Sequence, residues 1–419
     1  MTNSSENSKI THESDPSNRL TLENLPDQLT LEDALALTLM YNPELQMYST
    51  EIQIQEARAL QSSLFPNPEI EGEIEEFGGT GPRKGFSSAE TTIKVSQIFE
   101  LGGKRKKRTS IGLFEKKLAQ WDLERKKLDV ITKTKIAFID LILLQEKLAL
   151  SEHLIQLAKE VHSTIEEKVN AGKVSPLEGK KANIALSFSQ LEMGKIHRDI
   201  LVAKQYLSSL WGDLKVKVQG VVGDLKVTHP KALEHNFDQA KENPDLARLN
   251  TEMLRSQAIF QLEQANRIPN LTISAGVKHF EETSDQAYLV GLSFPLPLFD
   301  RNQGNYSASL YEDKKAKESS FLEKNRIENE LLRLHQEADF TFTEITTLEK
   351  NILPNAEESF TDSKEAYLQG KRDYLDLLDA QRTLFEVKVK HLESLGKYHK
   401  LHFLIDRLIG GSLGEDVEK

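Results

Sequence analysis

The sequence predicts a mainly α-helical protein built from two copies of one unit, each combining a pair of short β-strands with a long helical hairpin. Three observations predict this fold. A helix-start motif occurs twice, and each copy is followed by two segments in which polar and apolar residues alternate. Each half of the chain then contains a very long helical stretch that ends at a glycine, Gly172 or Gly370.

Composition excludes several classes of protein. The 419 residues include 54 Lys and Arg against 65 Asp and Glu, a net charge of −11, and no Cys. The chain therefore has no disulfide scaffold and no Cys-ligated zinc or iron–sulfur site, and it lacks the basic face that nucleic-acid binding needs. No apolar run is long enough for a transmembrane helix, whereas the short, half-apolar strands of a membrane β-barrel are compatible with this composition.

The predicted organisation has four parts. Residues 1–29 are rich in Ser, Asn and Thr and lack the apolar core of a signal peptide, so we expect a flexible tail there. If the protein is exported, its signal has been removed or the natural start lies upstream of this one. The first repeat is expected at 30–220, the second at 221–410, and a short C-terminal tail at 411–419.

The repeated motif is a helix start. Asn42-Pro43-Glu44-Leu45 returns as Asn243-Pro244-Asp245-Leu246, and each copy places an N-cap Asn before a Pro at the first helical position and an acid in the first turn. Each helix is expected to stop at a proline about two dozen residues later.

Four strands are predicted, at about 69–77, 90–99, 271–280 and 287–294. In the first, Ile70, Gly72 and Ile74 lie on one face and Glu71, Glu73 and Glu75 on the other; Lys94 lies on the polar side of the second. A water-soluble sheet packed on the helices would show the same alternation. Four strands cannot close a barrel, so if they span a membrane, several copies of the chain must share one barrel.

The two long helical stretches, 104–170 and 305–369, predict antiparallel hairpins with return helices from about 176 and 374. Ser175 and Asp373 are expected to cap the return helices, and Pro354 is expected to kink the second hairpin alone. An ordinary coiled coil is an alternative interpretation of these stretches.

The whole pattern resembles the TolC family of trimeric outer-membrane efflux ducts, and in particular its heavy-metal cation branch. The resemblance covers about residues 30–410 and is most specific at the strand exits, Val95 to Arg105 and Phe294 to Gly304, and at the second tip, where Tyr367-Leu368-Gln369-Gly370 precedes Leu375 to Gln381. It implies that three protomers form one twelve-stranded barrel on a long α-helical periplasmic tunnel.

The resemblance also implies sites. Tyr367 and Arg372 match positions that hold the family's closed periplasmic entrance, and Asp376 and Asp379 match positions that line it; no first-repeat partner is assigned. Because Asp376 and Asp379 are three residues apart, they share a helix face, although Asp376 could instead only cap its helix. Glu71, Glu73, Glu75 and Lys94 would face the barrel lumen and favour cations; a solvated acidic face is the alternative.

Three other features carry weaker signals. The basic run from Lys104 to Arg108 could contact lipid phosphates or simply be a solvated helix start. His399, His402 and Asp406 share one helix face but lack a fourth ligand, so no metal site is predicted. A glycine-rich loop at 78–85 lacks the ending of a phosphate loop, and no catalytic motif or cofactor fingerprint occurs, so we predict neither a cofactor nor an enzyme.

The functional hypothesis is therefore a passive outer-membrane exit duct of a tripartite efflux system, exporting heavy-metal cations. The expected partners are two further copies in a homotrimer, the outer-membrane lipid, an inner-membrane pump that supplies the energy, and a periplasmic adaptor that docks at the tips around Gly172, Ser175, Gly370 and Asp373. The alternative is a soluble coiled-coil scaffold or a periplasmic adaptor.

Overall fold

The computed structural model describes residues 25–213, 215, 217–230 and 232–410, and these form two compact units. The helical unit comprises the described chain up to Glu44, Lys127–Asn236 and the described chain from Leu331. The strand unit comprises Leu45–Lys126 and Phe237–Glu330. We describe each unit by itself.

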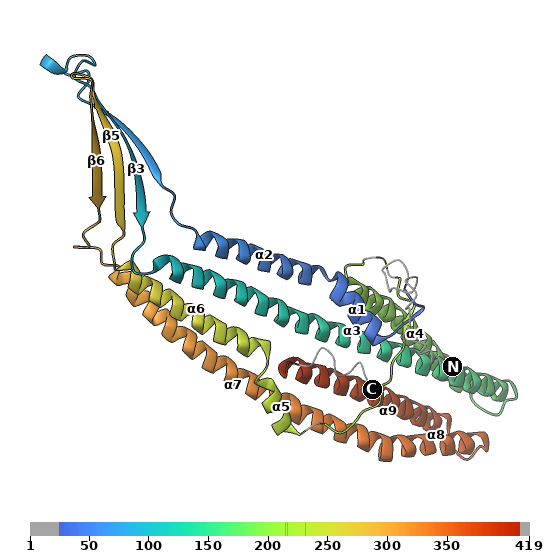
Figure 1. The fold of residues 1–419 in the computed structure, drawn as a ribbon. Helices are drawn as coiled ribbons and strands as arrows, with labels where there is room; N and C mark the ends of the chain where they lie inside the picture. Colours follow the sequence, from blue (N-terminus) through green and yellow to red (C-terminus); the bar gives the residue numbers. More distant parts are fainter. Residues whose placement is uncertain (1–24, 214, 216, 231, 411–419) are drawn as a thin grey trace, which may run out of the picture. The chain divides into compact units, whose positions relative to one another are not determined.

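A four-stranded antiparallel sheet in the order β2–β3–β5–β6 dominates the strand unit (Figure 1). The strands are β2 (Glu69–Glu75), β3 (Glu90–Phe99), β5 (Leu271–Phe280) and β6 (Asp285–Ser293). Two duplicated strand pairs within a mainly helical fold were expected, and the fold class is confirmed. The first strand is two residues shorter than expected and the last begins two residues earlier.

Long helices accompany this sheet, namely α2 (Pro43–Ser63), α6 (Pro244–Asn266) and the first parts of α3 (Lys104–Asn170) and α7 (Gln303–Thr347). At Gly112, α3 passes so close to α2 that an added Cβ would lie 2.9 Å from the Cα of Ala59. Polar contacts join α3 to α6, because Arg248 Nε donates to Asp122 Oδ1 at 2.6 Å and Trp121 Nε1 donates to Thr251 Oγ1 at 3.0 Å.

The helical unit contains the remaining parts of α3 and α7 and a set of shorter elements. These are β1 (Gln28–Leu29), α1 (Leu31–Tyr41), α4 (Pro176–Ser209), β4 (Gly220–Val221), the start of α5 (Leu233–Ala240), α8 (Leu353–Leu368) and α9 (Tyr374–Leu408). Across the described parts of the chain, no helix combines the length and the apolar character that a membrane span requires.

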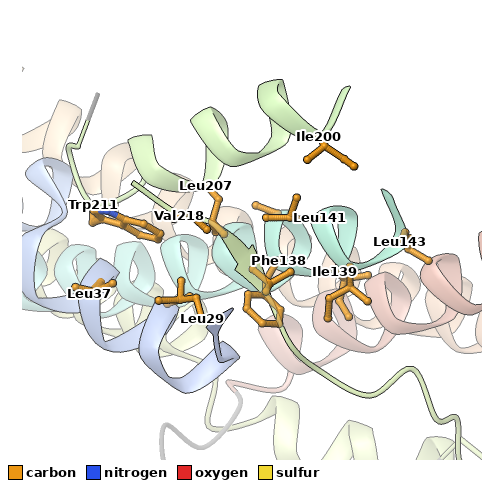
Figure 2. Packing of buried hydrophobic residues seen from close by; sticks show 14 of the residues in the cluster. Leu29, Leu37, Phe138, Ile139, Leu141, Leu143, Ile200, Leu207, Trp211 and Val218 are labelled. Carbon is orange, nitrogen blue, oxygen red and sulfur yellow. The ribbon is translucent and has the colours of Figure 1, made fainter. Parts of the chain in front are cut away.

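One apolar core in this unit joins the N-terminal segment, α3, α4 and the segment that follows α4. Trp211, Leu207 and Val218 gather near Leu37 and Phe138 (Figure 2), and all five side chains are almost completely buried. Residues distant in sequence are therefore held together by apolar burial, which is the main stabilising contribution to such a unit.

The structure corrects the predicted end of the N-terminal tail. Gln28 and Leu29, assigned to the tail from sequence, form β1 and pair in parallel with Gly220 and Val221 of β4. Leu29 is only 1% exposed and belongs to the apolar core. The polar composition of residues 1–29 as a whole gave no sign that Leu29 is buried. Residues 1–24 and the predicted tail at 411–419 lie outside the described residues.

Each asparagine of the repeated helix-start motif makes a side-chain hydrogen bond. Asn243 caps α6 as expected, because its side-chain oxygen accepts a hydrogen bond from the backbone N–H of Asp245 at 2.6 Å. The side-chain amide of Asn42 donates to the carbonyl of Leu210 at 2.6 Å. This bond ties the end of α1 to the end of α4.

The two long helical stretches differ as Pro354 predicts. α3 runs for 67 residues without interruption, or roughly 100 Å at about 1.5 Å per residue. The second stretch is broken by a π-helical turn at Leu348–Ile352, which is separated from Pro354 by Leu353 alone. Because proline has no N–H to donate to the preceding turn, the regular hydrogen-bond ladder cannot continue there.

The segment between the two repeats is held against α7 and α9 within the helical unit. Tyr398 donates its hydroxyl to the carbonyl of Thr228, and His229 packs edge-on against Phe342 with ring centroids 5.1 Å apart. His399 lies beside this segment, where burial lowers its pKa; the backbone of Leu225 and the carboxylate of Asp224 act more weakly in the opposite direction.

This burial predicts a pH dependence of stability. In the folded protein the pKa of His399 lies below 6.5, the value for an unperturbed histidine in the unfolded chain. As the pH falls through 6.5 towards the folded pKa, the unfolded chain therefore binds more protons than the folded chain. Stability is therefore fully present above 6.5 and decreases through that window. Thermal unfolding between pH 7 and pH 5, followed by circular dichroism, should show a steeper loss for the native protein than for His399→Gln. Equal slopes would contradict a buried neutral His399.

Candidate functional site: the hairpin tips and the polar face of the sheet

The register of the sheet places the four proposed lumenal residues on one face. Glu71 lies opposite Lys94, and Glu73 and Glu75 lie at alternate positions on the same strand, so their side chains share that face. Glu75 lies opposite Glu90, which sequence reasoning did not include.

Two lysines partly neutralise this polar face. Lys94 Nζ lies 3.0 Å from Glu71 Oε2, whereas Lys278 Nζ lies 3.1 Å from Glu75 Oε2 and 2.6 Å from Glu90 Oε2. Among the described residues, Glu73 makes no ion pair or hydrogen bond. On the acidic face, Glu71 and Glu75 are therefore paired with lysines, and Glu73 between them is exposed to solvent. Sequence alternation alone could not reveal these pairs.

The opposite face of the sheet is apolar and exposed. Ile70 and Val290 have relative exposures of 79% and 80%. The same face carries further exposed apolar side chains at alternate positions, namely Ile74, Ile93, Val95, Ile273, Val277, Tyr288 and Leu292. One sheet therefore presents a charged face and a continuous apolar face.

In the helical unit, the two hairpin tips have the same backbone geometry. Gly172 and Gly370 have φ of 69° and 72°, the left-handed region that favours glycine. Gly172 N donates to the carbonyl of Val169 at 2.9 Å and Gly370 N donates to that of Tyr367 at 3.1 Å. The backbone N–H of Lys173 donates to the carbonyl of Lys168, and that of Lys371 to the carbonyl of Ala366, both at 2.8 Å, as in a Schellman motif.

The predicted caps of the return helices are only partly present. Ser175 Oγ accepts from the backbone N–H of Leu177 at 3.2 Å and caps α4. Asp373 makes no side-chain capping bond, which corrects the prediction for α9. The carboxylate of Asp376, in the first turn of α9, accepts a hydrogen bond at 3.3 Å from Arg372, which precedes the helix.

Tyr367 is buried in the second tip and is not a free surface side chain. Its ring packs edge-on against Tyr374 with centroids 6.1 Å apart, and Lys168 Nζ lies 4.1 Å from the ring centroid. Lys168 Nζ also donates to the carbonyl of Tyr367 at 3.2 Å. The tip of α3 is thereby fastened to the end of α8.

A carboxylate from the first repeat belongs to this cluster. Burial, with a smaller contribution from the charge of Glu178, raises the pKa of Tyr367; burial, Tyr367 and Glu178 raise that of Tyr374 to about 12. Within the described chain, Tyr367 Oη and Glu178 Oε2 are buried without a hydrogen-bond partner. No first-repeat gate residue was assigned from the sequence, although Glu178 occupies the first-repeat position that corresponds to Asp376.

The other three predicted gate residues, Arg372, Asp376 and Asp379, are exposed. Arg372 and Asp376 form their ion pair on the outer surface of the tip, and Asp379 is exposed one turn further along α9. The structure therefore divides the predicted gate residues into an outward charged group and an inward tyrosine.

The residues considered as metal ligands serve other contacts. His402 packs against the ring of Tyr398 at 4.5 Å, and Asp406 lies 3.6 Å from Lys135 Nζ. No cluster of three or more His, Cys, Asp or Glu side chains suited to a metal ion occurs in the described parts of the chain.

Comparison with known proteins agrees with this arrangement of duplicated strand pairs and helical hairpins. The family model described as "Outer membrane efflux protein" matches residues 37–213 and 238–411, so the chain belongs to that family of outer-membrane efflux channels. The two matched ranges correspond closely to the two repeats seen in the sequence.

Individual relatives and structures are also similar. The cobalt-zinc-cadmium resistance protein CzcC of Cupriavidus metallidurans is 30% identical over 91% of this chain and 90% of its own. The nickel-cobalt-cadmium resistance protein NccC of Alcaligenes xylosoxydans is 25% identical over 68% of this chain and 64% of its own. A crystal structure of CusC shares the fold, with a TM-score of 0.77, 14% identity, and coverage of 91% of this chain and 92% of that one.

Proposed function

We propose that this outer-membrane efflux protein is the channel subunit of a tripartite system that exports heavy-metal cations. The observation that carries the proposal is the similarity to a cobalt-zinc-cadmium resistance protein across nine-tenths of both chains. The chain is a passive duct in this proposal, so an inner-membrane pump supplies the energy. A periplasmic adaptor docks at the tips around Gly172, Ser175, Gly370 and Asp373.

The sheet supports a trimer. β2 and β6 are the edge strands of the four-stranded sheet, and open edges in lipid leave backbone groups unsatisfied at a cost of several kcal/mol each. Three copies supply twelve strands and close these edges against one another. The apolar faces then contact lipid and the charged faces, with Glu73 and its neighbours, line the lumen.

Membrane fractionation and size measurement in detergent test this assembly. The proposal predicts that the protein is found in the outer membrane as a trimer. A soluble monomer in the cytoplasm would contradict both the trimer and the channel, and would favour a scaffold.

The ion pairs on the polar face predict how its charges set selectivity. Glu73→Gln should reduce the preference for K⁺ over Cl⁻ severalfold, because it removes an unpaired carboxylate from a ring of three. Lys278→Gln should increase that preference, because it leaves Glu75 and Glu90 uncompensated. Reversal potentials in planar bilayers measure both, with Lys315→Gln on α7 as the matched control. A pore that stays unselective or anion-selective in every variant would refute a lumenal role for this face.

A further inference from the structure

The connections between strands and helices expose an unusual number of apolar side chains. Phe99 pairs with Leu271, and Thr272 pairs with Ser293, so β3, β5 and β6 reach these connections at one end of the sheet. β2 begins at that same end, because Glu69 lies opposite Ser96. We call the exposed apolar side chains there the junction collar: Leu64, Phe65, Phe99, Leu101, Ile268, Phe294, Leu296, Leu298 and Phe299.

The basic run beside the junction collar divides into inward and outward side chains. Lys104 is buried, and its Nζ donates to Ile268 O and Asn270 Oδ1, both at 2.6 Å. Lys107 donates to the carbonyl of Gly102 at 2.9 Å, and Arg108 pairs with Glu100 at 2.5 Å. These three lysine and arginine side chains thus bind the protein's own acceptors.

Arg105 and Lys106 are the exposed members of the run. The guanidinium carbon of Arg105 lies 3.8 Å from the centroid of the Phe65 ring, which is itself 68% exposed. Its Nη1 makes only a long bond, 3.4 Å, to the carbonyl of Ser63. Lys106 has no hydrogen bond or ion pair among the described residues. The Arg105 guanidinium lies over the ring of Phe65 and keeps donors available to an external anion.

The segment that carries Phe65 is fixed to the apolar face of the sheet. Gln97 lies on that face by alternation with Ile93 and Val95, and its Nε2 donates to the carbonyl of Pro66 at 3.0 Å. Phe99 continues the same face. The exposed apolar surface of the sheet therefore runs into the junction collar and ends at two cations.

We propose that the junction collar is a lipid site. Arg105 and Lys106 bind the phosphates of anionic phospholipid headgroups, and Phe65, Phe299 and their apolar neighbours contact the acyl chains of the same lipids. The proposal rests on the membrane location of the sheet. Aromatic side chains favour the boundary between hydrocarbon and water, and cations near their tips can reach phosphate oxygens. A protein partner fits this surface less well, because burial of Arg105 and Lys106 in an apolar interface would need paired acids.

Tryptophan quenching tests the position of the junction collar. The full-length variants Phe65→Trp and Phe299→Trp are reconstituted in vesicles whose phospholipids carry bromine on the acyl chain near the headgroup. The fluorescence of both introduced tryptophans should be quenched. Ile93→Trp marks the sheet, and Phe321→Trp, exposed on α7, marks the helical surface; the wild type corrects for Trp121 and Trp211. If the tryptophan at position 93 is quenched and those at positions 65 and 299 are not, the lipid site at the junction collar is refuted and the channel assignment stands. If the tryptophan at position 93 is not quenched, the membrane location of the sheet itself is contradicted.

Lipid binding tests the two cations. In detergent, Arg105→Gln with Lys106→Gln should weaken phosphatidylglycerol binding severalfold relative to Lys314→Gln with Lys315→Gln, an equal charge change at exposed positions of α7. Millimolar inorganic phosphate should not compete. Equal affinity of the two double variants would overturn the headgroup site, and full competition by phosphate would show an anion site without lipid selectivity. If position 65 forms cross-links to a second copy of the chain and its tryptophan is not quenched, the junction collar is a protein contact and not a lipid site.

Discussion

Replacing Arg372 with alanine and Tyr367 with phenylalanine is expected to raise the single-channel conductance of the reconstituted protein severalfold. We propose that in the trimer Arg372 and Tyr367 hold the closed entrance through side-chain bonds to neighbouring helices, so that each bond occurs three times. A hydrogen bond to a charged group contributes about 1.5–3 kcal/mol. Its loss in three copies is comparable with the roughly 5.5 kcal/mol that shifts a two-state equilibrium from almost entirely closed to almost entirely open.

Each substitution removes a specific group. Arg372→Ala removes the exposed cation that pairs with Asp376, and Tyr367→Phe removes a buried hydroxyl while keeping the ring against Tyr374. Arg382→Ala is the matched control, because Arg382 is an exposed arginine that pairs with Glu386 one turn along the same helix, 2.8 Å away. Wild-type conductance in the double variant, or the same increase in the control, would show that the tips do not hold the entrance closed.

Replacing Trp211 with alanine is expected to destabilise the helical unit by about 3–5 kcal/mol, the usual range for truncating a buried tryptophan. Trp211 is 1% exposed and lies in the core that joins the N-terminal segment, α3 and α4 (Figure 2). Its Nε1 has no hydrogen-bond partner among the described residues, so only packing is lost.

Thermal unfolding in detergent, followed by circular dichroism, measures this loss. Trp211→Phe is the control, since it keeps most of the apolar volume and gives up no hydrogen bond; its midpoint should lie close to the wild-type value. An alanine variant as stable as the phenylalanine variant would mean that this core does not stabilise the unit.

Much of the fold could be predicted from sequence because it is encoded locally. The repeated Asn-Pro motif, the alternation around Glu71 and Glu73, and the glycines at 172 and 370 each determine backbone structure within a few residues. The mainly helical class and the duplicated strand pairs followed from these signals, as did the interruption before Pro354.

The contacts that depend on register or on tertiary packing were missed. Lys278 approaches Glu75 and Glu90 only because β5 pairs with β3 in one register, which alternation does not specify. Glu178 approaches Tyr367 because the two hairpin tips share one cluster; the repeat offset that relates it to Asp376 was a usable signal. The burial of Leu29 was missed because the residues around it in the sequence are mostly polar.

Deletion of the gene, followed by growth on a panel of metals and organic drugs, tests the central claim most directly. The proposed export of heavy-metal cations predicts that the deletion strain becomes sensitive to cobalt, zinc, cadmium or nickel and accumulates that metal, and that the wild-type gene restores growth. Sensitivity confined to organic drugs, with unchanged metal accumulation, would contradict the assignment of heavy-metal cations as the exported substrate.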